Sequence, residues 1–188
     1  MRCVDRLVRY LLRRLAGPAF SNPAFPWPIL VRHFLWQKLL RKNAHVPWPV
    51  HPTSILRCPD RIERGTRNPG MSPWCYIDAR NGIEIGEDTW IGPRVALISM
   101  NHDLNDYSRY VTEDPIRIGS NCWIGLGATI LPGVVLGDRT VVAAGAVVTK
   151  SADGHVILAG VPARPIRHLR AEMARDGRAS NGSAMEPS

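Results

Sequence analysis

The sequence has few of the residues that mark several common classes of protein. Aromatic residues make up 7% of the 188 positions, and four cysteines are present. The cysteines form no C-x-x-C pair and match no zinc-binding spacing, which indicates reduced thiols in a cytoplasmic protein. No run of about 18 uncharged apolar residues occurs, so the sequence predicts no membrane-spanning helix. The cysteines are Cys3, Cys58, Cys75 and Cys122.

Acidic residues are scarce in the first 42 positions, which hold nine basic residues and a single acid, Asp5. Arginines interrupt the apolar residues of this segment throughout, so we expect it not to be a secretory signal. The apolar residues from Val4 to Leu15 share one helical face, and Gly17-Pro18 predicts the end of that helix. A second apolar stretch runs from Ile29 to Leu40. We therefore expect residues 1–43 to form a basic, amphipathic helical region.

Aliphatic residues recur every six positions through much of the chain. This spacing is too long for a helical turn and fits a short strand followed by a corner. Three such units make one triangular coil of about 18 residues, whose aliphatic side chains point inward and stack on those of the next coil. The sequence therefore predicts a mainly β, parallel β-helix. The repeating residues are Ile85, Ile91 and Leu97, and then Ile118, Ile124, Ile130, Leu136, Val142 and Val148.

The repeat is interrupted once, between Leu97 and Ile118. Residues 99–115 are polar and hold Asp103, Arg109 and Pro115 where the period requires aliphatic residues. We expect a loop extruded from the coil, and loops on a rigid scaffold often carry function. The predicted division is therefore a β-helix domain at 44–168 containing this loop. A short helix or disordered tail is expected at 169–188.

Four segments resemble the hexapeptide-repeat O-acetyltransferases, a family that includes galactoside, maltose, nodulation and colanic-acid-type acetyltransferases. The resemblance extends over roughly residues 70–168. It implies that the β-helix is left-handed and that the co-substrate is acetyl-CoA. It also implies a homotrimer with active sites between neighbouring coils. The segments are NHD (101–103), PIRIGSNCWIG (115–125), ILPGVVLGDRTVVAAGAVVTK (130–150) and AGVPARPIR (159–167).

His102 is the residue expected to carry the chemistry. A hydroxyl group is a weak nucleophile near neutral pH, so its acylation by a thioester needs a base. Histidine can accept that proton and return it to the leaving thiolate, and the matching histidine of the family has this role in direct transfer. The group that orients the imidazole remains open between a nearby carboxylate and a backbone carbonyl. The carboxylates are Asp103, Glu113 and Asp114, and a backbone N–H within Gly125-Leu126-Gly127 is a candidate donor to the developing oxyanion.

The resemblance also places a binding site for acetyl-CoA on the coil. Leu126 and Ala144 are expected to line the groove for the pantetheine arm. Galactoside enzymes carry a small polar residue at position 126, so only a backbone contact would survive the change to leucine. Arginine binds phosphate bidentately and lysine acts as a point charge, which suits the adenosine end of the cofactor. The residues expected there are Thr149, Lys150, Arg164 and Arg167.

The acceptor site departs further from the family pattern. Galactoside enzymes use an Asn and an Asp that correspond to Ser72 and Arg80 in this chain. Asp78, Asn101 and Trp74 could instead supply hydrogen bonds or sugar stacking. We expect Ser72, Asp78 and Asn101 to contact the acceptor, most simply a sugar or glycan hydroxyl. A non-sugar acceptor of the serine or antibiotic type is the alternative.

Other functions would make different demands on the residues of this sequence. A γ-type carbonic anhydrase needs three zinc-binding histidines, and only His102 lies in the matching repeats, so no metal is expected. A non-catalytic scaffold or binding protein would be indifferent to loss of His102. The net charge of +8 favours an anionic partner, but no nucleic-acid recognition motif accompanies it.

The basic N-terminal region allows two interpretations. It could rest on an anionic membrane surface from the cytoplasmic side. It could instead cap the coil or pack on a neighbouring subunit, because the ends of a solenoid need covering.

Overall fold

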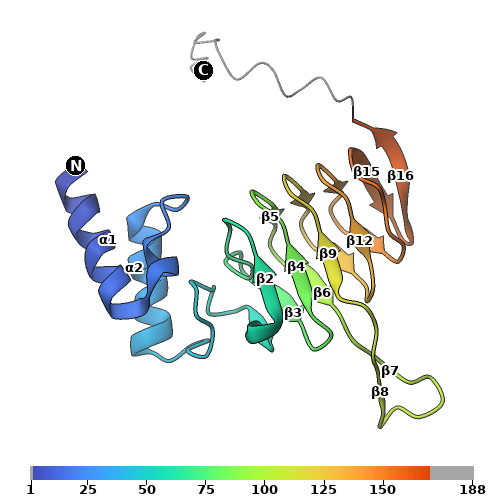
Figure 1. The fold of residues 1–188 in the computed structure, drawn as a ribbon, viewed down its shortest axis with the longest axis horizontal. Helices are drawn as coiled ribbons and strands as arrows, with labels where there is room; N and C mark the ends of the chain where they lie inside the picture. Colours follow the sequence, from blue (N-terminus) through green and yellow to red (C-terminus); the bar gives the residue numbers. More distant parts are fainter. Residues whose placement is uncertain (1, 170–188) are drawn as a thin grey trace, which may run out of the picture.

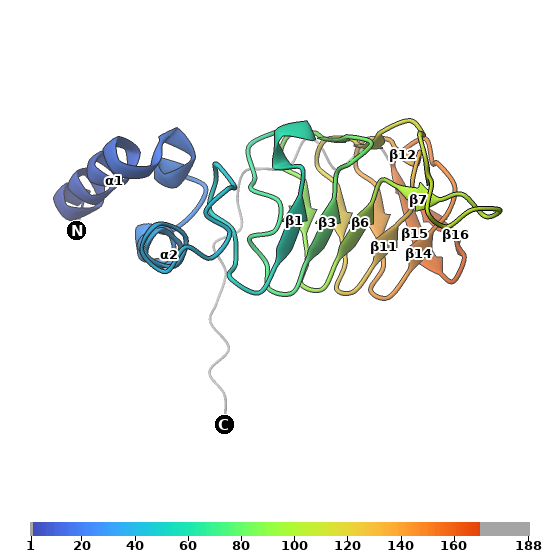
Figure 2. The same cartoon turned by 90° about the horizontal axis from the view of Figure 1, so that it is seen from below.

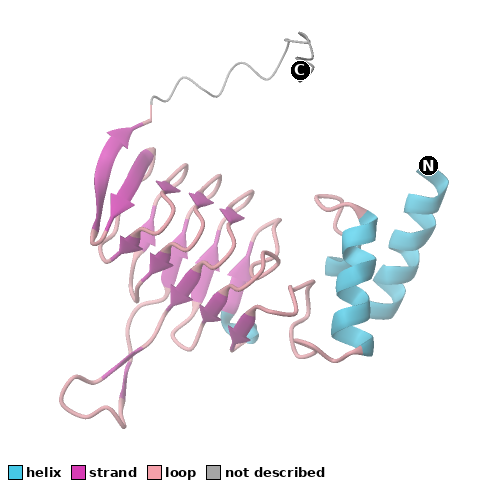
Figure 3. Ribbon diagram, turned by 180° about the vertical axis from the view of Figure 1, so that it is seen from behind, coloured by secondary structure: helices cyan, strands magenta, loops and turns pink. Residues whose placement is uncertain are grey.

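The computed structural model describes residues 2–169, so the predicted tail at 169–188 lies almost wholly outside the described residues. Helices occupy one end of the molecule and strands the other (Figure 3). None of the helices within residues 2–169 is long and apolar enough to cross a bilayer. The helical elements are α1 (Arg2–Ala16), the 3-10 turn η1 (Pro18–Ser21), α2 (Trp27–Phe34), the π-helical turn η2 (Leu35–Leu39) and a 3-10 turn η3 (Pro59–Arg61) within the first coil.

The strands wind into a three-faced coil (Figure 1). The first face contains β1 (Ile55–Arg57), β3 (Tyr76–Asp78), β6 (Ala96–Ile98), β11 (Thr129–Ile130) and β14 (Val147–Val148). The second face contains β2 (Ile62–Arg64), β4 (Ile83–Ile85), β9 (Ile116–Ile118) and β12 (Val135–Leu136). The third face contains β5 (Trp90–Ile91), β10 (Trp123–Ile124), β13 (Val141–Val142), β15 (Val156–Gly160) and β16 (Ala163–His168). Neighbouring strands are parallel, except that β16 returns antiparallel to β15.

The register of these strands stacks the predicted aliphatic residues on one another. Leu97, Ile130 and Val148 are successive partners on the first face. All six aliphatics from Ile118 to Val148 are at most 2% exposed. The residue two positions before each of them is buried as well, so each six-residue unit contributes two side chains to the core. The predicted parallel β-helix is thus confirmed, because the six-residue period is the period of core burial.

The corners of the coil explain the recurring glycines. A Cβ atom added at Gly86 would lie 2.6 Å from the backbone nitrogen of Ser120 on the next coil. A Cβ added at Gly125 would lie 2.7 Å from the carbonyl oxygen of Val142. Stacked coils therefore approach too closely at these two corners for any side chain.

Residues 99–115 leave the coil at the corner between the first and second faces. The segment is a hairpin in which β7 (Asn101–His102) pairs antiparallel with β8 (Tyr110–Val111). Figure 2 shows it projecting from the coil beside the C-terminal strands. The Asn81 side-chain amide ties its base together by donating to the carbonyl oxygens of Ser99 (2.9 Å) and Val111 (3.0 Å). The expected extruded loop is present, and two of its segments pair as the short antiparallel strands β7 and β8.

The N-terminal end of the coil is covered by the chain that follows α1. Val46, Trp48 and Val50 are buried in the coil's own hydrophobic core. The buried side chain of Gln37 holds this segment, donating to the Trp48 carbonyl (2.9 Å) and accepting from the Val50 N–H (2.8 Å). Helix α1 packs through Leu12 into a separate small core with Phe20 and Leu30. Figure 1 shows α2 between α1 and the coil, so α1 does not cover the coil end.

Candidate active site

His102 lies on β7 with its imidazole exposed to solvent. Its Nδ1 atom is 2.6 Å from the carbonyl oxygen of Tyr107 at the hairpin turn. A carbonyl oxygen can only accept, so Nδ1 carries the proton in this contact, and Nε2 is the nitrogen with the lone pair in the neutral imidazole. The hairpin thus presents a nitrogen that can take a proton from a bound hydroxyl group.

The orienting group of His102 is therefore a backbone carbonyl. Of the nearby carboxylates, Asp103 accepts the Asn105 N–H at 2.8 Å and thereby shapes the hairpin turn. An open hollow surrounds the imidazole, and Glu113 lies on its wall. The other residues of this hollow are Asn101, Asp103, Leu104, Asn105, Tyr107 and Val111.

A row of side chains connects the hairpin to the coil. The ring of Tyr110 packs on the imidazole of His102, with their centroids 4.6 Å apart. The guanidinium of Arg80 also packs on Tyr110, 4.5 Å from the ring centroid. Arg80 Nη2 in turn donates to Asp78 Oδ2 at 2.7 Å. Burial raises the pKa of Asp78, but the hydrogen bonds and charge of Arg80 outweigh it and hold that pKa below its usual value.

The residues expected to contact the acceptor are not all placed together. Asn101 is exposed next to His102 on β7. Asp78 is 1% exposed and engaged by Arg80, so it supports the hairpin through Arg80 and Tyr110. Ser72 lies at a different corner, between the third and first faces, where its Oγ donates to the Ile91 carbonyl at 2.6 Å. Of the three, only Asn101 lines the hollow around the imidazole.

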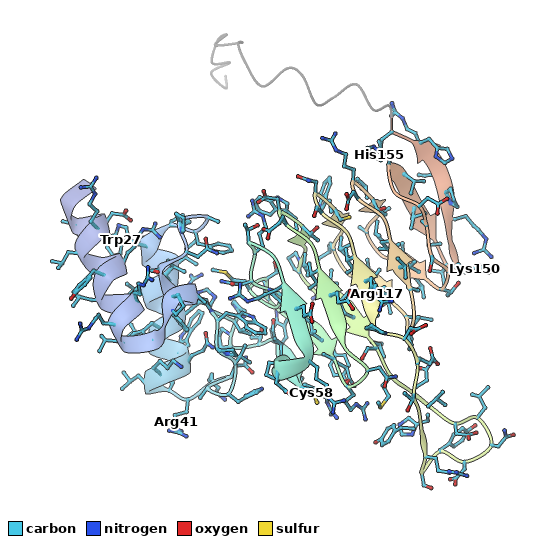
Figure 4. The ribbon with its side chains drawn as sticks, in the orientation of Figure 1. Trp27, Arg41, Cys58, Arg117, Lys150 and His155 are labelled. Carbon is cyan, nitrogen blue, oxygen red and sulfur yellow. The ribbon has the colours of Figure 1, made fainter. Side chains whose placement is uncertain are left out.

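The residues expected to bind acetyl-CoA lie along the outside of the later coils. Leu126 and Ala144 occupy equivalent corners of successive coils, where the Gly145 N–H donates to the Leu126 carbonyl at 2.8 Å. Thr149 and Lys150 are exposed directly after β14, which is the last strand of the first face. Figure 4 shows Lys150 at the C-terminal end of the coil, close to β16. The two expected arginines, Arg164 and Arg167, are exposed on β16.

The corner expected to hold the oxyanion has few free donors. The N–H of Gly125 donates to the Val142 carbonyl at 2.8 Å, and that of Gly127 donates to the Pro93 carbonyl at 2.9 Å. Both bonds stack one coil on the next. Of the three residues in this stretch, Leu126 is the one whose N–H is not engaged in such a bond.

The comparisons with known proteins agree with this architecture. Residues 115–150 match the family model described as the hexapeptide repeat of succinyl-transferase. Galactoside O-acetyltransferase of Escherichia coli is 41% identical over 90 residues, which cover 46% of this chain and 44% of that protein. The chain is thus similar to hexapeptide-repeat acetyltransferases over its repeat region. A putative acetyltransferase of Schizosaccharomyces pombe is 41% identical over 93 residues, covering 48% of this chain and 45% of that protein.

Solved structures of the family extend the likeness. A galactoside acetyltransferase in complex with coenzyme A has a TM-score of 0.57 at 25% identity, covering 90% of this chain and 80% of that one. A maltose O-acetyltransferase from Clostridium difficile has a TM-score of 0.53 at 28% identity, covering 62% of this chain and 64% of that one. The chain spans about half the length of the curated relatives it matches.

The supporting residues of the hairpin could not be assigned a role from the sequence. The sequence suggested Arg80 only as a substitution at an acceptor position, and Tyr107, Tyr110 and Asn81 were not singled out. The sequence does contain a signal for a hairpin, because the turn-forming residues Asn105, Asp106 and Ser108 separate two short segments that could pair.

Proposed function

We propose that the protein is an acetyl-CoA-dependent O-acetyltransferase in which His102 is the general base. The observation that carries the proposal is the hydrogen bond from His102 Nδ1 to the Tyr107 carbonyl, which makes Nε2 the basic nitrogen of the neutral, exposed imidazole. It is supported by the named activity of the galactoside and maltose enzymes that the chain resembles. This single nitrogen can serve both proton transfers of the reaction.

In the proposed reaction, His102 Nε2 removes the proton of an acceptor hydroxyl as its oxygen attacks the carbonyl carbon of the acetyl thioester. The carbon–sulfur bond then breaks, and His102 returns the proton to the departing thiolate of CoA. The products are an acetyl ester and free CoA, so no acyl-enzyme forms. Leu126 N–H is placed to donate to the carbonyl oxygen as negative charge develops there.

The acetyl donor requires a groove and a set of cations. We assign the pantetheine arm to the corner formed by Leu126 and Ala144, which stack on successive coils. The exposed side chains of Thr149, Lys150, Arg164 and Arg167 would bind the adenosine phosphates. A structure of a related galactoside enzyme contains coenzyme A, which supports this donor. Because the family resemblance implies active sites that are each built from two subunits, we propose that the active form is a homotrimer.

The acceptor is proposed to be a sugar or glycan hydroxyl. A putative lipopolysaccharide biosynthesis O-acetyl transferase of Escherichia coli is 29% identical over 117 residues, 56% of this chain and 60% of that protein. Asn101, beside the imidazole, offers both a donor and an acceptor to a sugar hydroxyl. Incubation with acetyl-CoA and a panel of mono- and oligosaccharides, serine and aminoglycosides tests the assignment through thiol release and acetylated product. Product with saccharides alone supports it, and product with serine or aminoglycosides alone would replace it.

We also propose that α1 rests on an anionic lipid surface. One of its faces packs on α2 and η1, whereas Val4, Leu7, Leu11 and Leu15 are 47–66% exposed along another. Exposed arginines lie on the same helix, so the apolar stripe is flanked by positive charge. Apolar side chains that enter an interface while arginines bind anionic headgroups are typical of helices lying on a membrane.

A further inference from the structure

A cavity of about 250 Å³ lies where the helical region meets the first coil. It exists because the first coil has no strand on the third face, where residues 65–75 run as turns and bends. The wall on the helical side includes Ile29 and His33 of α2. The coil side includes Arg67, Asn68 and Met71, and Trp90 of β5.

This cavity gathers the buried polar atoms that lack partners. Over residues 2–169, four buried side-chain nitrogen or oxygen atoms have no hydrogen-bond partner. All four belong to residues that line this cavity: Nε2 of His33, Nε of Arg67, and both Nδ2 and Oδ1 of Asn68. His33 is 1% exposed and Asn68 is 5% exposed. Buried polar groups in native proteins are nearly always satisfied, so such a concentration at one cavity points to a ligand.

The chemistry of these atoms defines what the ligand must offer. His33 Nδ1–H donates to the Ile29 carbonyl at 2.7 Å, which leaves Nε2 as an acceptor. Burial, with a contribution from Arg32, lowers the pKa of His33 and so favours the neutral imidazole. Asn68 offers one acceptor and an amino group that donates, and Arg67 offers its Nε–H. The cavity therefore combines acceptors with donors rather than presenting one kind alone.

Hydroxyl groups both donate and accept, and a sugar ring carries several of them beside apolar C–H faces. Apolar walls for such faces come from Ile29, Met71 and the indole of Trp90, on which the Arg67 guanidinium packs at 3.4 Å. We propose that this cavity binds one monosaccharide unit, with hydroxyl groups paired to His33 and Asn68. Ser72 also lines the cavity, but its hydroxyl group already donates a hydrogen bond to the Ile91 carbonyl.

The position of the cavity separates it from the His102 hairpin of the same protomer. It opens beside α2 and the third face, whereas the hairpin leaves the third coil at the corner between the other two faces. Figure 1 shows the hairpin directed away from the helices. The sugar bound here would be a different unit of the glycan from the one that bears the reacting hydroxyl. That reading of its role rests on the proposed function, whereas the binding itself does not.

Ligand-observed saturation-transfer NMR on the full chain, without acetyl-CoA, tests the binding directly. Glucose, galactose and N-acetylglucosamine serve as probes at millimolar concentration. We expect at least one to receive saturation, and His102→Ala to leave that signal unchanged, so failed transfer and failed binding are distinguishable. Absence of a signal with all three probes would overturn the proposal.

Asn68→Leu gives a second, independent readout. It removes both unpaired atoms of Asn68 while keeping the side-chain volume. We expect at least a tenfold loss of saccharide binding together with an unchanged or higher melting temperature. The matched control, Asp60→Leu on the exposed turn η3, should bind as the wild type does. If Asn68→Leu fails to fold, His33→Phe replaces it, because it removes Nε2 and keeps a ring. Undiminished binding in the folded variant would overturn the proposal.

Discussion

The Nδ1 atom of His102 and the carbonyl oxygen of Tyr107 lie 2.6 Å apart within one hairpin of residues 99–115. The base and the group that fixes its tautomer thus belong to the same hairpin. Because the partner is a backbone atom, the identity of residue 107 matters less than the shape of the turn. The same hairpin depends on the coil through Tyr110 and Arg80 for its position.

Replacement of Tyr110 by alanine is expected to lower kcat by up to about tenfold, because an aromatic pair contributes about 0.5–1.5 kcal/mol to holding a ring in place. The KM for acetyl-CoA should stay near the wild-type value, since Tyr110 lies away from the proposed CoA groove. Steady-state kinetics check this. Tyr110→Phe should retain most of the rate, and so should Tyr107→Ala, because Tyr107 acts through its backbone. Equal losses in Tyr110→Ala and Tyr107→Ala would contradict the packing role.

The ion pair between Asp78 and Arg80 predicts a pH-dependent stability. The pKa of Asp78 lies below its ordinary value in the folded protein. Its contribution is therefore complete above the unfolded pKa of about 3.9 and is lost as pH falls through the lower folded value. We expect Asp78→Asn to lose about 1–3 kcal/mol of unfolding free energy at pH 7. That difference from wild type should shrink as the pH drops below about 3.9.

Urea unfolding at several pH values measures this effect, and a surface pair supplies the control. Arg117 Nε and Glu84 Oε2 are 3.0 Å apart, but both side chains are more than 40% exposed. Glu84→Gln should therefore cost less than about 1 kcal/mol at neutral pH. A cost for Asp78→Asn no larger than that of Glu84→Gln would show that the buried pair does not anchor the hairpin.

Lys150→Ala and Arg164→Ala are each expected to weaken CoA binding about 5- to 30-fold, as loss of one charge-assisted phosphate contact of about 1–2 kcal/mol predicts. Calorimetric titration with CoA and with pantetheine checks the assignment. The loss should vanish with pantetheine, which lacks the adenosine phosphates. Arg109→Ala, on the exposed hairpin, is the matched control for removing a positive charge. A similar loss in Arg109→Ala would reduce the effect to general electrostatics.

Flotation with lipid vesicles tests the proposed role of α1. The full chain should float with phosphatidylglycerol vesicles and remain behind with phosphatidylcholine vesicles, because both arginines and apolar residues are needed. The double variant Leu7→Ser and Leu11→Ser should lose flotation. Leu104→Ser alters an exposed leucine of the hairpin instead and should float normally. Absence of wild-type flotation with the anionic vesicles would reject the membrane surface as the partner of α1.

The sequence predicted the coil well because its core has a strict period. Each aliphatic residue from Ile118 to Val148 must fill one layer, so a six-residue spacing leaves few other folds open. The strand pairing of the hairpin and the residues that support it follow no such period, so the spacing did not predict them. Asp78 and Arg80 are two residues apart, yet their effect on His102 passes through Tyr110, thirty positions later, and only the folded coil brings them together. Similarly, the cavity near Asn68 lies where the first coil lacks the six-residue period, so the spacing gave no prediction for the side chains that line it.

The most direct test of the central claim separates acetyl transfer from donor binding in His102→Ala. Single-turnover transfer from radiolabelled acetyl-CoA to an identified acceptor gives the first quantity, and calorimetric titration with CoA gives the second. His155→Asn is the control, because it removes an exposed histidine whose left-handed backbone (φ 49°) asparagine tolerates. We predict that His102→Ala loses at least about 100-fold in transfer rate with CoA affinity unchanged. Transfer at the wild-type rate in His102→Ala would contradict the account.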